Sequence, residues 1–218
     1  MRINTLLLFF LLAMFIAAML QVHLFEIAFA KLGVSPAISL LLLIGTLFGS
    51  GINIPVYSVH THAAGHLVPT PDNKMIWEIY QPAREGKTVI AVNVGGCLIP
   101  LGLSFYFMSL QLINPIFMLL GVLAIGTLSH KSSQLIQGMG VGMPILIAPI
   151  TAALFALVVD PAHAAHLAYI SGVLGVLLGA DIMKLKAITQ LGAPVVAIGG
   201  AGTFDGIFIT GIIAALLA

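Results

Sequence analysis

Seven apolar stretches follow one another along this chain, and several are long enough to cross a lipid bilayer. They cover about residues 4–30, 36–50, 88–112, 116–129, 143–159, 163–184 and 194–218. A helix needs about 20 apolar residues to span the hydrocarbon core. The runs are continuous rather than alternating, which predicts helices and not the strands of a membrane barrel. The sequence therefore predicts one all-α integral membrane domain over residues 1–218, with about seven transmembrane helices.

Charged residues are too scarce for a water-soluble surface. Eight Lys and Arg and seven Asp and Glu make up 7% of the 218 residues, whereas soluble domains carry roughly 25%. A net charge of +1 leaves no basic patch for a nucleic acid, so the expected partner is the lipid bilayer. The single Cys97 excludes an internal disulfide and a cysteine zinc cage. We expect it to be a small buried residue, and no cofactor is implied.

Glycine and proline interrupt the apolar pattern at three places. A break follows the second helix at Gly51–Pro55, and Gly95 and Gly96 break the third stretch, whose first half could be extended with a regular helix starting near Cys97. In the last stretch, the glycines at 199–202 predict a segment that stops and restarts. We expect Thr203 to be the N-cap of the restarted helix, so some spans are discontinuous.

The only long polar stretch is the loop at residues 56–87. Residues 56–59 and 75–80 alternate and are rich in β-forming residues, which makes a hairpin plausible, with its turn at residues 69–73. Lysine and arginine set the orientation of this loop. With the N-terminus in the cytoplasm, seven of the eight basic residues fall inside and only Lys31 falls outside. This bias predicts a multi-pass protein of the inner (cytoplasmic) membrane, with a cytoplasmic β-hairpin-like loop and an external C-terminus.

Two aspartates, Asp181 and Asp205, lie in otherwise apolar, glycine-rich sequence. A carboxylate in hydrocarbon costs several kcal/mol unless it is partnered, hydrated or protonated. In a continuous last helix Asp205 would lie roughly 16 Å deep, against about 5–8 Å for Asp181. The predicted break brings both to a similar depth, near the cytoplasmic face. Two simpler interpretations stay open: an ion pair of Asp181 with Lys184, and stabilisation of Asp205 by its helix N-terminus.

A stripe of glycines bears on the direction in which the Asp181 side chain points. Gly172, Gly175 and Gly179 share one face of a regular helix, and Asp181 points about 180° away from Gly172 at 100° per residue. The last helix therefore need not pack on this stripe, and whether the two carboxylates face each other is open.

Two facing carboxylates would share one proton, because like charges a few ångströms apart cannot both ionise cheaply. One could then act as a base on water and the other as an acid on a carbonyl. This favours a two-aspartate intramembrane site of a protease- or hydrolase-like enzyme, with Asp181 and Asp205 catalytic and a membrane peptide as substrate. The alternative is a small proton- or cation-coupled transporter or channel for a small solute. A third hypothesis is a non-catalytic structural membrane protein, and the oligomeric state is open.

Other polar residues are candidates for lining the same cavity. Asn53 and Asn93 flank breaks at similar depth and could either satisfy broken backbone or line the cavity, as could Thr203, Gly202 and Lys184. The histidines form a weaker metal candidate, namely His60, His62 and His66, because two of them share a face of a strand.

The segments GADIMKL at 179–185, GGAGTFDGIFITG at 199–211, GINIP at 51–55 and NVGG at 93–96 resemble an uncharacterised family of polytopic prokaryotic membrane proteins, domain-of-unknown-function family 1614. That resemblance covers most of the chain and implies no activity. The arrangement of Asp181 and Asp205 is more loosely similar to GxGD-type intramembrane aspartyl proteases. The chain departs from them: no tyrosine directly precedes Asp181, the glycine before Asp205 is displaced, and no Pro-Ala-Leu motif follows.

Overall fold

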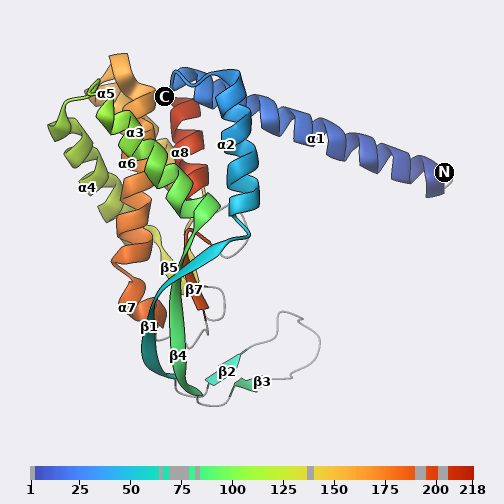
Figure 1. The fold of residues 1–218 in the computed structure, drawn as a ribbon, viewed down its shortest axis with the longest axis vertical. Helices are drawn as coiled ribbons and strands as arrows, with labels where there is room; N and C mark the ends of the chain where they lie inside the picture. The colour runs from blue at the N-terminus through green and yellow to red at the C-terminus, as the bar shows by residue number, and fades with distance from the viewer. Residues whose placement is uncertain are drawn as a thin grey trace.

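The protein is mostly helical, and it combines a helical bundle with a β-sheet beyond one end of the bundle (Figure 1). The computed structural model describes residues 3–63, 66–68, 79–81, 84–136, 140–189, 195–200 and 206–218. The helical elements are α1 (Ile3–Lys31), α2 (Pro36–Gly49), η1 (Val94–Leu98), α3 (Ile99–Ser109), α4 (Pro115–Ser132), α5 (Ile147–Val159), η2 (Pro161–His163), α6 (Ala164–Val176), η3 (Leu177–Ile182), α7 (Leu185–Thr189) and α8 (Gly206–Leu217). The strands are β1 (Asn53–Ala63), β2 (His66–Val68), β3 (Ile79–Gln81), β4 (Arg84–Asn93), β5 (Gln134–Ile136), β6 (Gly140–Gly142) and β7 (Val195–Ile198).

Helix α1 is attached to the bundle by its C-terminal end only. The Phe25 ring lies 5.6 Å from that of Phe208 on α8, and the Lys31 ammonium donates a 2.8 Å hydrogen bond to the Leu216 carbonyl. The rest of the helix projects away from the bundle (Figure 1). At 29 residues it is about 43 Å long, and the large apolar side chains along its outer part are exposed.

The sheet differs from the hairpin that the sequence predicted, because residues 57–59 pair with residues 88–90 and not with residues 75–80. Strands β1 and β4 pair antiparallel, from Asn53 opposite Asn93 to Ala63 opposite Arg84. The pairing therefore starts before residue 56, and β4 takes in the beginning of the predicted third span. Strand β7 adds to β4 in parallel and completes the order β1-β4-β7. Two small antiparallel pairs, β2 with β3 and β5 with β6, accompany the sheet.

Two neighbouring strands lead toward helices of the bundle. β4 runs directly into the π turn η1 and on into α3, which confirms the extended first half of this stretch and a helix beginning near Cys97. β7 is followed by Gly199 and Gly200, both with positive φ (+83° and +85°), and α8 begins at Gly206. The predicted interruption of the last stretch is confirmed. Its first piece is a strand and not a helix, because Val195, Val196 and Ile198 are β-branched and pair with β4.

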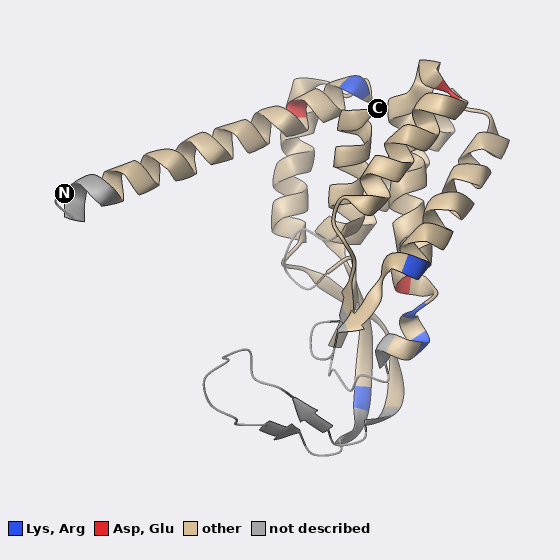
Figure 2. Ribbon diagram, turned by 180° about the vertical axis from the view of Figure 1, so that it is seen from behind, with Lys and Arg blue, Asp and Glu red and all other residues tan. Residues whose placement is uncertain are grey.

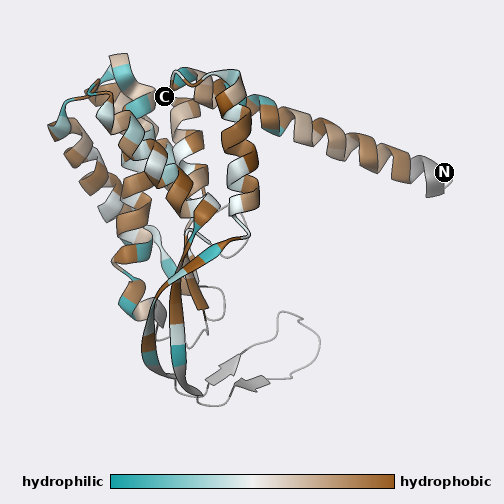
Figure 3. Cartoon of the chain, in the orientation of Figure 1, coloured by the Kyte–Doolittle hydropathy of each residue, from teal (hydrophilic) through white to brown (hydrophobic). Residues whose placement is uncertain are grey.

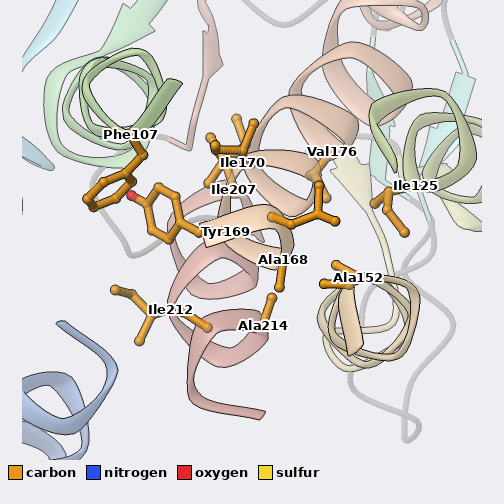
Figure 4. Packing of buried hydrophobic residues seen from close by; sticks show 14 of the residues in the cluster. Phe107, Ile125, Ala152, Ala168, Tyr169, Ile170, Val176, Ile207, Ile212 and Ala214 are labelled. Atoms are coloured by element: carbon orange, nitrogen blue, oxygen red, sulfur yellow. The ribbon is translucent and has the colours of Figure 1, made fainter. Parts of the chain in front are cut away.

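Helix α6 is the centre of the core. Leu167, Tyr169, Ile170 and Val173 are fully buried between α3, α4, α5 and α8. Figure 4 shows Tyr169 of α6 beside Phe107 of α3. The two rings meet edge to face at 5.4 Å, an arrangement that aromatic pairs favour.

The predicted glycine stripe contacts α4, α8 and α5, the last because a Cβ atom at Gly172 would lie 3.6 Å from that of Ala152. A Cβ atom at Gly175 or Gly179 would meet Ile125 or the backbone of Gly126 on α4 at 3.0 Å or less, whereas one at Gly172 would meet Thr210 of α8 at 3.0 Å. Small residues let helix backbones approach closely. Gly175 and Gly179, at the C-terminal side of the stripe, therefore pack against α4, whereas Gly172 packs against α8.

Large apolar side chains are exposed on the outside of the bundle and small polar side chains are buried inside it; hydrophobic residues predominate along the bundle helices (Figure 3). Phe48 is 74% exposed and Val158 is 82% exposed, whereas Ser104, Ser129 and Ser171 are fully buried. Three helical segments of the described chain are long and apolar enough to cross a membrane: Leu7–Lys31, Pro115–Ser132 and Pro161–Ala187. These segments are compatible with a membrane protein.

Charged residues lie at the two ends of the bundle (Figure 2). The end that carries the sheet holds Lys131, at the last turn of α4, Lys184, between η3 and α7, and Lys186 of α7. The opposite end holds Lys31, together with Asp160 at the end of α5. The long middle part of the bundle between them contains no described charged residue.

Candidate functional site

Asp181 lines a cavity between the lower end of α6 and the beginning of α8. The cavity has a volume of about 230 Å³. Asp181 is partly exposed as a residue, and its Oδ2 atom is shielded from solvent. The residues around the cavity come from the segment after β5, from α6 and η3, and from the first turns of α8: Val141, Gly142, Met143, Ile145, Val176, Ala180, Asp181, Gly206, Ile209 and Thr210.

A π turn directs Asp181 toward α8. The turn η3 covers Leu177–Ile182, and the N–H of Met183 donates to the carbonyl of Leu178, five residues back. A π turn holds more residues than an α turn, so it rotates the residues that follow. Gly172 contacts Thr210, and Asp181 lines the cavity with the same Thr210. A regular α-helix would place these two residues of α6 and η3 on opposite faces.

The second candidate aspartate, Asp205, directly precedes a residue of the cavity wall in the sequence. Gly206, the residue after Asp205, forms part of the cavity wall. Asp205 itself, with Thr203 and Gly202, lies outside the described residues. The distance between the two carboxylates, and the roles predicted for Gly202 and Thr203, therefore stay predictions.

Lys184 lies one turn after Asp181 and reaches across to α4. Its ammonium donates a hydrogen bond to the Ser133 carbonyl, at the C-cap of α4. Cations are favoured at this position because the last carbonyls of a helix carry partial negative charge. The contact joins the end of η3 to the end of α4, beside the cavity.

Asn53 and Asn93 lie at the junction of β1, β4 and α2. The Asn93 amide donates to the Ser50 carbonyl at 2.7 Å and to Asn53 Oδ1 at 3.0 Å, and its own oxygen accepts from the N–H of Gly96 at 2.7 Å. Asn93 is fully buried. These contacts match the interpretation in which the side chain satisfies broken backbone, and neither asparagine is among the residues that line the cavity of Asp181.

The histidine candidates lie on the strands beyond the bundle. His60 and His62 belong to β1 and His66 to β2, but the side chains of His62 and His66 lie outside the described part of the chain. Among the described residues, no group of three His, Cys, Asp or Glu side chains could hold a metal ion. Cys97 is buried, in agreement with the prediction of a small core residue.

The sequence did not single out the other walls of the cavity. Thr210 is 1% exposed, and a hydroxyl in the otherwise apolar α8 was an available signal. The segment Val141–Ile145 carries no pattern that ties it to Asp181, because its position depends on the pairing of β5 with β6. The cavity thus joins one carboxyl group and one hydroxyl to mostly apolar walls. It has room for several water molecules, since one needs roughly 10–15 Å³ of such space.

Comparison with protein families gave one match. The family model described as "Protein of unknown function (DUF1614)" matches residues 47–217. The match includes both aspartates and the whole cavity wall, and leaves out α1 and most of α2. Neither the curated proteins nor the solved structures contained a match.

Proposed function

The chain belongs to the DUF1614 family, and we propose that it is an integral membrane hydrolase with a two-aspartate site near the cytoplasmic face. The inside-out distribution of side chains supports the membrane part of this proposal. Large apolar side chains cover the bundle, and serine and threonine lie within it. In water this surface would be a large exposed apolar patch, whereas lipid solvates it.

The lysines support one orientation. Lys87, Lys131, Lys184 and Lys186 belong to the sheet end, and Lys31 to the opposite end. By the positive-inside rule the sheet faces the cytoplasm, the N-terminus of α1 is cytoplasmic and the C-terminus of α8 is external. This arrangement corresponds to a multi-pass protein of the inner membrane with seven spans.

The observation that supports the proposed activity is the cavity beside Asp181. Asp181 and Gly206, which follows Asp205, border the same space of about 230 Å³. A pair of carboxyls there would share one proton. The ionised one takes a proton from water, whose oxygen adds to a substrate carbonyl carbon, while the other gives its proton to the carbonyl oxygen. The resulting diol then collapses: the C–N bond breaks, and the amide nitrogen takes up the proton that the first carboxyl removed from water. The substrate class that we propose is a membrane-embedded peptide.

The transport alternative predicted amide oxygens of Asn53 or Asn93 around a carboxylate. Asn93 is occupied by Ser50, Asn53 and Gly96 instead. This observation favours hydrolysis over a transport site of that composition.

A photoreactive peptide that contains a hydroxyethylene isostere tests the proposed activity, because this group mimics the diol. The full chain in lipid nanodiscs should be labelled by the probe, and an excess of the non-photoreactive peptide should compete. Asp181→Asn and Asp205→Asn should each reduce labelling at least tenfold, and Asp160→Asn, at the opposite end, should leave it unchanged. Equal labelling of all four proteins would overturn the proposal. Proton uptake by proteoliposomes that depends on Asp181, without labelling, would establish the transporter.

A further inference from the structure

The π turn η3 leaves one backbone acceptor open close to Asp181. In a regular α-helix the Gly179 carbonyl would accept a hydrogen bond from the N–H of Met183. Here that N–H donates to Leu178 at 2.9 Å. A buried carbonyl without a donor is unfavourable, so the π turn needs a donor from outside its own helix.

His130 of α4 supplies this donor. Its Nδ1 atom lies 3.2 Å from the Gly179 oxygen. A carbonyl can only accept a hydrogen bond, so Nδ1 carries the proton in this contact. Nδ1 keeps this proton in the cationic form of the ring and in one of the two neutral tautomers, so the contact does not require a charged histidine.

Gly126, one turn earlier on α4, allows α4 to approach η3 closely enough for this contact. Residues four apart share a face of a helix, so Gly126 and His130 both face η3. A Cβ atom at Gly179 would lie 2.0 Å from the Gly126 carbonyl oxygen, which means that the two backbones touch. The close approach of α4 is what allows the short imidazole side chain to reach the open carbonyl.

We propose that His130 is a positioning residue: its hydrogen bond to Gly179 holds the π turn that directs Asp181 into the cavity. Without the donor, η3 recovers its bond from Met183 to Gly179 by returning to α-helical geometry. That change rotates Asp181 away from Thr210 and α8. The consequence for activity rests on the proposed function of the cavity, whereas the control of the direction of Asp181 does not.

Cysteine crosslinking measures this direction. We would place Asp181→Cys with Thr210→Cys in a Cys97→Ser chain and add a short bifunctional methanethiosulfonate. His130→Asn keeps an N–H donor close to the position of Nδ1, His130→Leu removes the donor, and His130→Gln moves it further along the side chain. Crosslinking should stay within twofold for His130→Asn and fall at least fivefold for His130→Leu and His130→Gln.

A second cysteine pair controls for the fold. A Cβ atom at Gly172 would lie 3.7 Å from that of Ala214, close to the mean for a disulfide. Gly172→Cys with Ala214→Cys reports on α6 and α8 before the π turn, and its crosslinking should be the same in all His130 variants. If His130→Leu does not fold by this control, His130→Gln decides.

Two results would overturn the inference: undiminished crosslinking of positions 181 and 210 in the folded His130→Leu chain, or in His130→Gln where His130→Leu does not fold, or an equal loss in His130→Asn. With native Asp181, labelling by the isostere probe should follow the same order, with His130→Asn rescuing it. Crosslinking that depends on His130 while Asp181→Asn leaves labelling unchanged would refute the proposed function alone. Labelling that depends on both aspartates but not on His130 would refute this inference alone.

Discussion

Replacing Gly179 with alanine tests the contact on which the cavity depends. The added methyl group would lie 2.0 Å from the Gly126 carbonyl oxygen and 2.8 Å from its carbon. Both atoms belong to backbone, so α4 and η3 must move apart. Overpacking of this kind costs about 1–3 kcal/mol, and the better helix propensity of alanine offsets up to about 1 kcal/mol of it. We expect a net loss of about 1–2 kcal/mol.

Cys97 provides the assay for this prediction. It is the only cysteine of the chain and is 3% exposed, so a maleimide dye that fluoresces on reaction reports its exposure during heating. At about 2–4 °C per kcal/mol for a chain of this size, the midpoint of Gly179→Ala should fall by about 2–8 °C.

Gly102→Ala is the matched control. Gly102 lies within α3, and a Cβ atom there would meet nothing within 4 Å. The substitution should leave the midpoint unchanged or raise it by about 2–4 °C. Equal midpoints for Gly179→Ala and Gly102→Ala would refute the reasoning, because they would mean that the backbones of α4 and η3 do not touch.

Three further predictions concern other parts of the molecule. Asn93→Leu should lower the thermal midpoint by about 4–10 °C, because it leaves buried groups of Ser50 and Gly96 without partners, at roughly 2 kcal/mol or more; Asn53→Ala should cost less, and an equal or larger cost would contradict the assigned contacts. Alkaline phosphatase fused after residue 218 should be active and the same enzyme inserted at residue 64 inactive; the reverse pattern would exclude the proposed orientation. Phe25→Ala should increase protease cleavage between α1 and α2 in detergent, because it removes the ring contact with Phe208, and unchanged cleavage would mean that this contact does not hold α1.

The first two helices could be predicted from the sequence because their signal is local. Apolar runs bounded by proline and glycine placed the first two helices within a residue or two of Ile3–Lys31 and Pro36–Gly49. The break at Gly95 and Gly96 and the interruption after Ile198 could be predicted for the same reason, since glycine disfavours regular structure wherever it occurs.

The sheet could be predicted only in part because its pairing is not local. Strand β7 pairs with β4 across more than a hundred residues, and nothing in the four residues of β7 specifies that partner. An apolar β-branched run of this length fits either a strand or a buried helix. The predicted helical piece was therefore wrong, although the position of the break was right.

The direction of Asp181 could not be predicted because it depends on α4. Regular α-helical periodicity places Asp181 opposite Gly172, and the residues of η3 carry no π-turn signal of their own. The turn depends on Gly126 and His130, about fifty residues earlier in the chain. The candidate site was therefore found by its chemistry, as a carboxylate in apolar sequence, and not by its geometry.

The direct passage from β4 into α3 has a mechanical consequence. No loop separates the strand from the helix, and the N–H of Val94 continues the pairing by donating to Ile52 at 3.0 Å. Gly96 at this passage touches the carbonyl of Gly199 at the end of β7, a few residues before the start of α8. Because no loop lies at this point, a force that tilts β1 and β4 relative to the bundle is not absorbed there. Such a force is transmitted to α3 and, through the contact of Gly96 with Gly199, to the end of β7.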